Sequence, residues 1–240
     1  MTVVPYKEEK AGKKEQVAKM FDNISHRYDF LNHLLSMGID KGWRRKSIRL
    51  LEPLKPRQIL DVATGTGDFA LQALSLKPEK VTGIDISEGM LAVGRKKVAA
   101  RKVDDKVELL CADSENIPFE GNKFDAVTVA FGVRNFENLE RGLREIYRVL
   151  KPGGMLVVLE FSRPRTFPFR QVYSFYFKFV LPKIGRMVSS DRAAYTYLPE
   201  SVAAFPDGDD FLECLRTVGF KDTKCRTLTF GISSIYSGAK

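Results

Sequence analysis

The chain has 240 residues, 44% of them hydrophobic and 29% charged, with a formal net charge of +9, a composition that excludes an integral membrane protein and a disordered one. No apolar stretch approaches the ~20 residues of a bilayer-spanning helix, and the first thirty residues are rich in Lys and Glu, so we expect no secretory signal. Two histidines and three cysteines, without a Cys-x-x-Cys pair, argue against a metal site and fit the reducing cytosol.

Residues 1–55 precede the first predicted strand and have the pattern of a helical arm. Val17, Met20, Phe21 and Ile24 recur at the spacing of one helix face. We expect this arm to precede a single domain formed by residues 56–240.

From residue 58 onward, short β-branched runs alternate with segments of helical periodicity, which is typical of an α/β fold with a parallel sheet. The predicted strands are 58–62, 81–85, 107–112, 124–130 and 155–161, followed by a hairpin of 223–230 and 233–237. The predicted helices are 68–75, 88–101 with Ser87 as its N-cap, and 139–150, which Pro152 and the two glycines after it end.

The loop after the first predicted strand, Thr64-Gly65-Thr66-Gly67, predicts a ligand site. Its glycines let a ligand approach bare backbone, and the amides that begin the next helix bind polar groups. Asp85 ends the second predicted strand, where a carboxylate accepts hydrogen bonds from both hydroxyls of a ribose. These features favour a nucleoside cofactor, and an ordinary tight turn with a solvated aspartate is the alternative.

Charge distinguishes between the nucleoside cofactors. Asp68 would place a carboxylate near the pyrophosphate of a dinucleotide, a repulsion of about 1 kcal/mol or more. S-adenosylmethionine carries a sulfonium and an ammonium group and no phosphate, so a loop flanked by Asp61 and Asp68 favours it. An NAD-linked oxidoreductase on the same fold is the alternative.

Asp113 and Ser114 follow the third predicted strand, at the sheet edge where ligands of open α/β folds bind. Asp113 is placed to accept a hydrogen bond from an adenine amino group, with the Ser114 amide beside it. The alternative is an aspartate that only forms the turn before Ile117 and Pro118.

The basic charge lies outside the predicted sheet: residues 1–60 and 163–192 each carry +6, whereas residues 61–162 carry −2. Residues 163–206 form an insertion, and eight of the 26 aromatic residues lie within residues 161–187, interleaved with Arg and Lys. This insertion is either a surface helix packed on the core or a lid over an apolar ligand that also touches a membrane surface.

Several stretches together resemble the quinone-biosynthesis C-methyltransferases, which methylate demethylmenaquinol or its ubiquinone-pathway counterpart. The resemblance covers nearly the whole chain, and residues 131–135 and 159–164 are its more specific parts. The stretches are 20–29 (MFDNISHRYD), 61–68 (DVATGTGD), 83–91 (GIDISEGML), 113–119 (DSENIPF), 131–135 (FGVRN), 148–164 (RVLKPGGMLVVLEFSRP) and 211–220.

The resemblance implies a class I S-adenosylmethionine-dependent methyltransferase with a Rossmann-like sheet of seven mostly parallel strands and a lipid-tailed quinol as its substrate. Carried over residue by residue, it assigns the cofactor to the glycine loop at Gly65 and Thr66, to Asp85, and to Asp113 with Ser114. Ala63 departs from the general methyltransferase loop, which has glycine there. Whether the acceptor is a naphthoquinol or a benzoquinol stays open.

Arg134 is the predicted catalytic residue, because it follows the fourth predicted strand and faces the cofactor methyl. It stabilises the phenolate of the quinol or orients a water that takes the proton. Asn135 is its neighbour, and His26, Tyr28 and Tyr197 are further candidates for moving that proton.

A quinol with a prenyl tail resides in the bilayer, so we expect a cytoplasmic enzyme that attaches peripherally to the inner face of the membrane through residues 163–187. A nucleic-acid methyltransferase is the remaining rival, favoured by the basic pI. No Pro-Pro-aromatic motif follows the fourth predicted strand and no Pro-Cys pair is present, so we expect no nucleic-acid partner. Homo-oligomerisation stays open.

Overall fold

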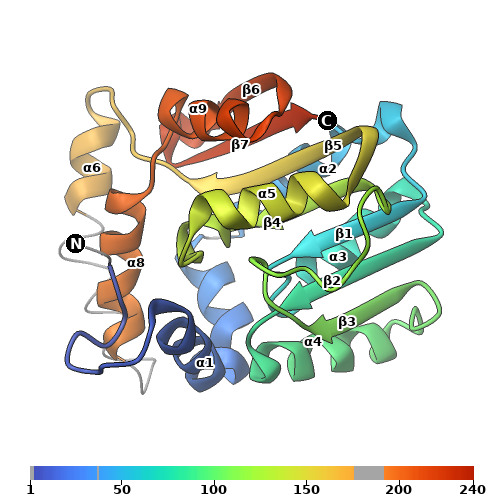
Figure 1. Cartoon of the computed structure of the whole chain (residues 1–240). Coiled ribbons are helices and arrows are strands. Elements are labelled where there is room, and N and C mark those ends of the chain that lie inside the picture. Colours follow the sequence, from blue (N-terminus) through green and yellow to red (C-terminus); the bar gives the residue numbers. More distant parts are fainter. Residues whose placement is uncertain (1–2, 37, 176–191) are drawn as a thin grey trace.

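The computed structural model describes residues 3–36, 38–175 and 192–240. In it, seven strands form one sheet in the order β3-β2-β1-β4-β5-β7-β6 (Figure 1). Strand β7 is antiparallel to both of its neighbours and the other pairs are parallel, which confirms the predicted fold class. The strands are β1 (Gln58–Val62), β2 (Lys80–Asp85), β3 (Val107–Cys111), β4 (Phe124–Ala130), β5 (Leu150–Phe161), β6 (Lys221–Leu228) and β7 (Ser233–Ala239).

Helices cover both faces of the sheet, because successive residues of a strand point to opposite sides. Leu60 and Val62 of β1 pack with α5 (Leu139–Val149) and α9 (Asp209–Val218). Ile59 packs on the other face with α2 (Ile39–Arg49), α3 (Asp68–Ala73) and α4 (Glu88–Ala100). The remaining elements are α1 (Lys13–Leu35), α6 (Phe169–Phe175), α8 (Arg192–Ala204) and the 3-10 turns η1 (Glu52–Leu54), η2 (Leu74–Leu76), η3 (Val133–Asn135) and η5 (Thr229–Gly231).

The observed boundaries of the predicted elements lie within two residues of the prediction, except after α5. The Ser87 hydroxyl accepts the Met90 amide at 3.1 Å, so Ser87 is the N-cap of α4 as predicted. Strand β5 begins at Leu150, directly after α5, although the predicted strand begins at residue 155. The register with β4 shifts there, from Phe124 opposite Leu150 to Ala126 opposite Met155. A bulge in the strand therefore accommodates Pro152 and its glycines.

Strands β1 and β4 lie side by side although β2 and β3 separate them in the sequence. The chain runs from β1 toward one edge of the sheet and then returns to β4 on the other side of β1 (Figure 1). Open α/β sheets bind ligands beside the carboxyl ends of their strands at such a reversal. The topology thus places the loops after β1 and β4 around the expected site.

The first 55 residues contain two helices with different surroundings. Val17 of α1 is buried against Tyr197 of α8. Trp43 and Ile48 of α2 are buried in the core that the sheet shares with α3 and α4, and the Trp43 indole donates to the Thr229 hydroxyl at 2.8 Å. Helix α2 thus packs against the sheet although it lies within the first 55 residues. The division of the chain at residue 55 stays a prediction.

The predicted insertion contains α6 and α8, and residues 176–191 between them lie outside the described residues. Phe169 of α6 stacks on Phe230 of η5, with ring centroids 3.8 Å apart and planes 4° from parallel. This contact joins α6 to the turn between β6 and β7. In the ranges that the structure describes, no helix combines the length and the apolar character needed to cross a bilayer.

Candidate active site

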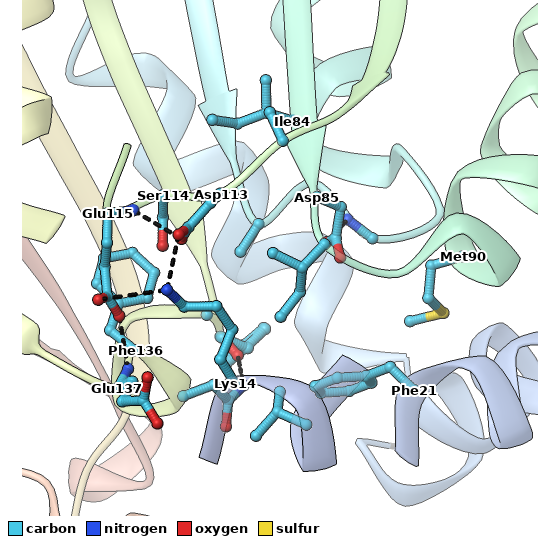
Figure 2. A pocket seen from close by; sticks show the side chains of 18 of the residues that line it. Lys14, Phe21, Ile84, Asp85, Met90, Asp113, Ser114, Glu115, Phe136 and Glu137 are labelled. Carbon is cyan, nitrogen blue, oxygen red and sulfur yellow. Dashed lines mark hydrogen bonds and ion pairs between the residues drawn. The ribbon is translucent and has the colours of Figure 1, made fainter. Parts of the chain in front are cut away.

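An open cavity lies at the carboxyl ends of the central strands, beside α1. Its walls come from the loops after β1, β2, β3 and β4 and from α1 (Figure 2). Ligands of open α/β folds bind at this edge of the sheet. Of the six predicted site residues, four line this cavity: Gly65, Asp85, Asp113 and Ser114.

A buried carboxylate holds the loop after β1. Asp61 accepts hydrogen bonds from the hydroxyls of Thr64 and Thr128, each at 2.6 Å, and so ties the end of β1 to β4. Burial raises the pKa of Asp61 to about 6, although both threonine hydrogen bonds favour its charged form. Ala63, which departs from the general methyltransferase loop, has a φ of 53°, in the left-handed region that favours glycine. A Cβ on Gly132 would lie 2.5 Å from the Ala63 Cβ, so the absent side chain at 132 makes room for the alanine.

Asp85 is the polar anchor of the cavity. Its Oδ2 accepts the Gly65 amide at 2.8 Å and its Oδ1 accepts the Ser87 amide at 2.9 Å. Burial raises the pKa of Asp85 to about 6, and the backbone amides only partly offset this effect. Each carboxylate oxygen has a second lone pair, so Asp85 remains able to accept hydroxyl groups of a ligand.

Asp113 and Ser114 also line the cavity, and Asp113 has a partner that the sequence did not suggest. Lys14 of α1 lies 2.7 Å from Asp113 Oδ2 and 3.6 Å from Glu115 Oε2 (Figure 2). The Glu115 amide donates to Asp113 Oδ1 at 2.9 Å, which fixes the turn. Asp113 therefore forms the turn and also lines the cavity, and its hydrogen bond to an adenine amino group stays a prediction.

Thr66 and Asp68 point away from the cavity lining. Asp68 pairs with Lys97 of α4 at 2.7 Å, and the same ammonium lies 2.5 Å from Asp29, so Asp68 faces α4 instead of the cavity and its repulsion of a pyrophosphate stays a prediction. The Thr66 hydroxyl donates to Asp29 at 2.6 Å and accepts from Lys97 at 2.9 Å. Thr66 is not among the described residues that line the cavity, and its role in cofactor binding stays a prediction.

Polar side chains of helix α1 form hydrogen bonds or ion pairs with all four loops of the site. The Lys13 ammonium donates to the carbonyls of residues 134 and 136 after β4, at 3.1 and 2.8 Å. Lys14 pairs with Asp113 after β3, and Asp22 accepts the Ser87 hydroxyl and the Gly89 amide after β2. Asp29 contacts the loop after β1 through Thr66. Sequence reasoning found the apolar face of this helix but not its polar contacts, which join residues far apart in the chain.

Arg134 lies behind the cavity wall. Its side chain is 7% exposed, and its Nη1 donates to Glu160 Oε1 at 2.7 Å and to the Phe131 carbonyl at 2.5 Å. Among the described residues, its neighbours Gly132 and Asn135 line the cavity but Arg134 does not. Its catalytic role therefore stays a prediction, on a residue that lies beside the cofactor cavity.

The other proton-handling candidates separate clearly. Tyr28 lines the cavity, whereas the His26 side chain is exposed to solvent. The Tyr197 hydroxyl donates to Asn135 Oδ1 at 3.1 Å, and burial raises the pKa of Tyr197 to about 12. Tyr197 is therefore neutral at physiological pH and connects α8 to the cavity wall.

The charged residues of the cavity lining also bear on which cofactor the cavity binds. The described lining carries four carboxylates, Asp85, Asp113, Glu115 and Glu137, against one lysine, Lys14. Such a lining attracts a cation and repels a pyrophosphate. Apolar side chains beside these carboxylates suit an adenine ring; they include Ile84, Ile86 and Met90. The residues present therefore fit the sulfonium, the ribose and the base of S-adenosylmethionine.

Comparisons with known proteins identify the family of the chain. Residues 8–240 match the model of the ubiE/COQ5 methyltransferase family. The demethylmenaquinone methyltransferase of Bacteroides fragilis is 50% identical over 99% of this chain and 97% of its own length. The ubiquinone/menaquinone biosynthesis C-methyltransferase UbiE of Geotalea daltonii is 48% identical over 95% and 97%.

Among solved structures, an S-adenosylmethionine-dependent methyltransferase of Thermotoga maritima aligns with a TM-score of 0.66 at 21% identity, covering 92% of this chain and 99% of that one. This likeness shows the fold, and the family match shows the kind of enzyme. The chain therefore belongs to the ubiE/COQ5 methyltransferase family and is an S-adenosylmethionine-dependent methyltransferase.

Proposed function

We propose that the chain transfers a methyl group from S-adenosylmethionine to a ring carbon of demethylmenaquinol, a naphthoquinol with a prenyl tail. The observation that carries this proposal is the 50% identity, over almost the full length of both chains, to a protein named demethylmenaquinone methyltransferase. A ubiquinone-pathway benzoquinol is the second candidate acceptor, because the name of the Geotalea daltonii relative covers both quinones.

The cavity residues hold and orient the cofactor. When bound, S-adenosylmethionine supplies an electrophilic methyl group on a positively charged sulfur. Asp85 accepts the ribose hydroxyls, and Asp113 with Ser114 takes the edge of the adenine. The carboxylates of the lining complement the positive charge, and α1 forms one wall of the cavity. Fixing two reactants in this way supplies several kcal/mol of the barrier reduction.

Arg134 activates the acceptor. A hydroquinone carbon becomes a strong nucleophile when the ring hydroxyl loses its proton, because the resulting oxyanion pushes electron density into the ring. A buried guanidinium next to the cofactor cavity stabilises that oxyanion. Asn135 and Tyr197 form the wall between the cavity and α8, and they orient the ring beside it.

The acceptor proposal is tested in cells that lack their own demethylmenaquinone methyltransferase. Expression of this chain should convert accumulated demethylmenaquinone into menaquinone, as mass spectrometry of extracted quinones would detect. A chain carrying Asp85→Asn, which removes the anchor for the ribose, is the matched control and should not restore menaquinone. Accumulation of demethylmenaquinone in the presence of the wild-type chain would contradict the proposed acceptor.

The same proposal includes peripheral attachment to the membrane, because the acceptor's tail lies in the bilayer. Four apolar side chains on or beside α6 and η5 are strongly exposed: Phe167 at 79%, Val172 at 64%, Phe175 at 60% and Phe230 at 65%. The stacking of Phe169 on Phe230 brings α6 and η5 together, and Arg165 and Arg170 are exposed beside them. Exposed aromatic and basic side chains in one region suit the interface of an anionic bilayer.

Sedimentation with anionic vesicles tests this attachment. Replacing Phe167, Phe175 and Phe230 with serine should release most of the protein from vesicles at low salt, because each buried aromatic ring contributes about 1–3 kcal/mol. Ile39→Ser is the matched control, because Ile39 is an exposed apolar residue on α2, away from α6. Equal sedimentation of the triple variant and the wild type would contradict attachment through this surface.

A further inference from the structure

Glu160 is a buried carboxylate near the end of β5 for which the cofactor cavity offers no role. It is fully buried, and it is not among the described residues that line the cavity. Its Oε1 accepts Arg134 Nη1 at 2.7 Å and the Phe161 amide at 2.8 Å, and its Oε2 accepts the Arg134 amide at 3.4 Å. Burial raises the pKa of Glu160, and the Arg134 charge opposes that rise. Glu160 thus accepts hydrogen bonds from both the backbone amide and the guanidinium of Arg134.

Arg134 has a hydrogen-bond donor that Glu160 does not use. Its Nη1 is occupied by Glu160 and the Phe131 carbonyl, and the guanidinium carbon lies 5.5 Å from the centroid of the Phe161 ring. Its Nε is buried and has no hydrogen-bond partner among the described residues. An unpartnered buried donor is unfavourable, and a ligand that supplies an acceptor removes this penalty.

The pair lies between the cofactor cavity and the insertion. On the cavity side, Gly132 and Asn135 flank Arg134 in the chain and line the cavity. On the other side, the charges of Arg134 and Glu160 both act on the hydroxyls of Tyr173 of α6 and Tyr197 of α8. The pair therefore interacts with the insertion while its neighbours in the chain form part of the cavity wall.

We propose that Glu160 is a positioning residue: it orients the Arg134 guanidinium so that its unpartnered N–H binds the oxyanion of the methyl acceptor. This inference rests on the proposed function. Packing alone does not explain a buried ion pair, because apolar residues of similar volume often stabilise a protein equally well. Orientation does explain it, since Glu160 binds both Nη1 and the backbone amide of Arg134, and the Phe131 carbonyl accepts from the same Nη1.

Steady-state kinetics of Glu160→Gln test the proposal. Glutamine has nearly the same shape but no charge, so the guanidinium loses its fixed orientation, and kcat with a short-tailed demethylnaphthoquinol should fall at least about tenfold. The Kd for S-adenosylhomocysteine should stay within about threefold of wild type, because Glu160 does not line the cavity. Rates are expressed per S-adenosylhomocysteine site, so loss of folded protein does not imitate a loss of kcat.

Two further variants separate positioning from general stability. Glu160→Asp keeps the charge and should recover part of the lost kcat. Asp125→Asn removes a half-buried carboxylate that pairs with Lys151 near the amino end of β4, away from the cavity. This variant should lower the melting temperature without changing kcat. A Glu160→Gln effect on the melting temperature alone, with kcat per site unchanged, would overturn the proposal.

A double-mutant cycle gives the decisive result. If Glu160 acts only through Arg134, then Glu160→Gln should lower kcat little further once Arg134→Lys is present. Multiplicative losses in kcat would overturn the proposal, because they would mean that the two residues act independently. Methyl transfer by the wild-type chain is measured in the same series, so a failure of the proposed acceptor would appear as no wild-type turnover and is distinct from these outcomes.

Discussion

Replacing Asp85 with asparagine should weaken cofactor binding by roughly 30- to 1,000-fold. The carboxylate already accepts two backbone amides, at 2.8 and 2.9 Å, and its remaining lone pairs are expected to accept two ribose hydroxyls. Asparagine keeps one neutral oxygen and replaces the other with an NH2 group that cannot accept. Losing one charge-assisted hydrogen bond and weakening the other amounts to about 2–4 kcal/mol, which gives the stated change in Kd.

The same residue should make cofactor binding depend on pH. Ribose hydroxyls favour the charged carboxylate, and the pKa of Asp85 in the free protein is about 6. Affinity should therefore be constant well above pH 6 and fall as the pH drops through this value, by up to about tenfold per pH unit. Folding stability responds in the opposite direction. Because the folded pKa is raised, the contribution of Asp85 is complete below its unfolded pKa and is lost as the pH rises through 6.

Calorimetric titration with S-adenosylhomocysteine between pH 5 and pH 8 measures the Kd of wild type and of Asp85→Asn, and how the wild-type Kd depends on pH. Asp68→Asn is the matched control, because Asp68 directly follows the loop whose Gly65 amide Asp85 accepts, but it pairs with Lys97 outside the cavity lining. We expect that variant to bind within about threefold of wild type. Near-normal binding by Asp85→Asn, or a wild-type affinity that is flat across this range, would refute the role assigned to Asp85.

Three further predictions concern the walls of the cavity and the core. Replacing both Asp22 and Asp29 with asparagine removes two fastenings of α1, so stopped-flow measurements should show S-adenosylhomocysteine leaving about three- to tenfold faster; an unchanged rate would mean that α1 does not retain the ligand. Gly132→Ala would place a Cβ 2.5 Å from the Ala63 Cβ and so displace one wall; calorimetry should show at least about tenfold weaker binding, and normal affinity would contradict the close approach. Phe211→Ala removes a fully buried ring between α9 and the sheet, and urea unfolding should show a loss of about 3–5 kcal/mol, whereas a loss below about 1 kcal/mol would contradict this packing.

Local sequence patterns predict the sheet well. The predicted strands 58–62 and 124–130 coincide with β1 and β4, because β-branched runs that are buried on both faces leave little choice of conformation. Ser87 is the N-cap of α4 for an equally local reason, since its hydroxyl satisfies an amide three residues away. The predicted start of the fifth strand at residue 155 is wrong, because proline and glycine interrupt a strand pattern in isolation, whereas pairing with β4 continues the strand through a bulge.

The site is only partly predictable from the sequence. Asp85 and Asp113 were found because they end adjacent parallel strands, which meet at one edge of the sheet. The partners of Asp68 and Asp113 were missed because Lys97 and Lys14 lie 29 and 99 residues away in the sequence, and no spacing rule joins them. The pairing of Glu160 with Arg134 was missed, because a single acid in an apolar strand does not reveal the arginine that it faces.

Transfer of a deuterated methyl group tests the central claim most directly. The wild-type chain is incubated with methyl-deuterated S-adenosylmethionine and reduced demethylmenaquinone in vesicles, and the product is analysed by mass spectrometry and NMR. The account predicts that the labelled methyl group is attached to a carbon of the quinol ring. A label on a ring oxygen, or no transfer to the quinol at all, would contradict it.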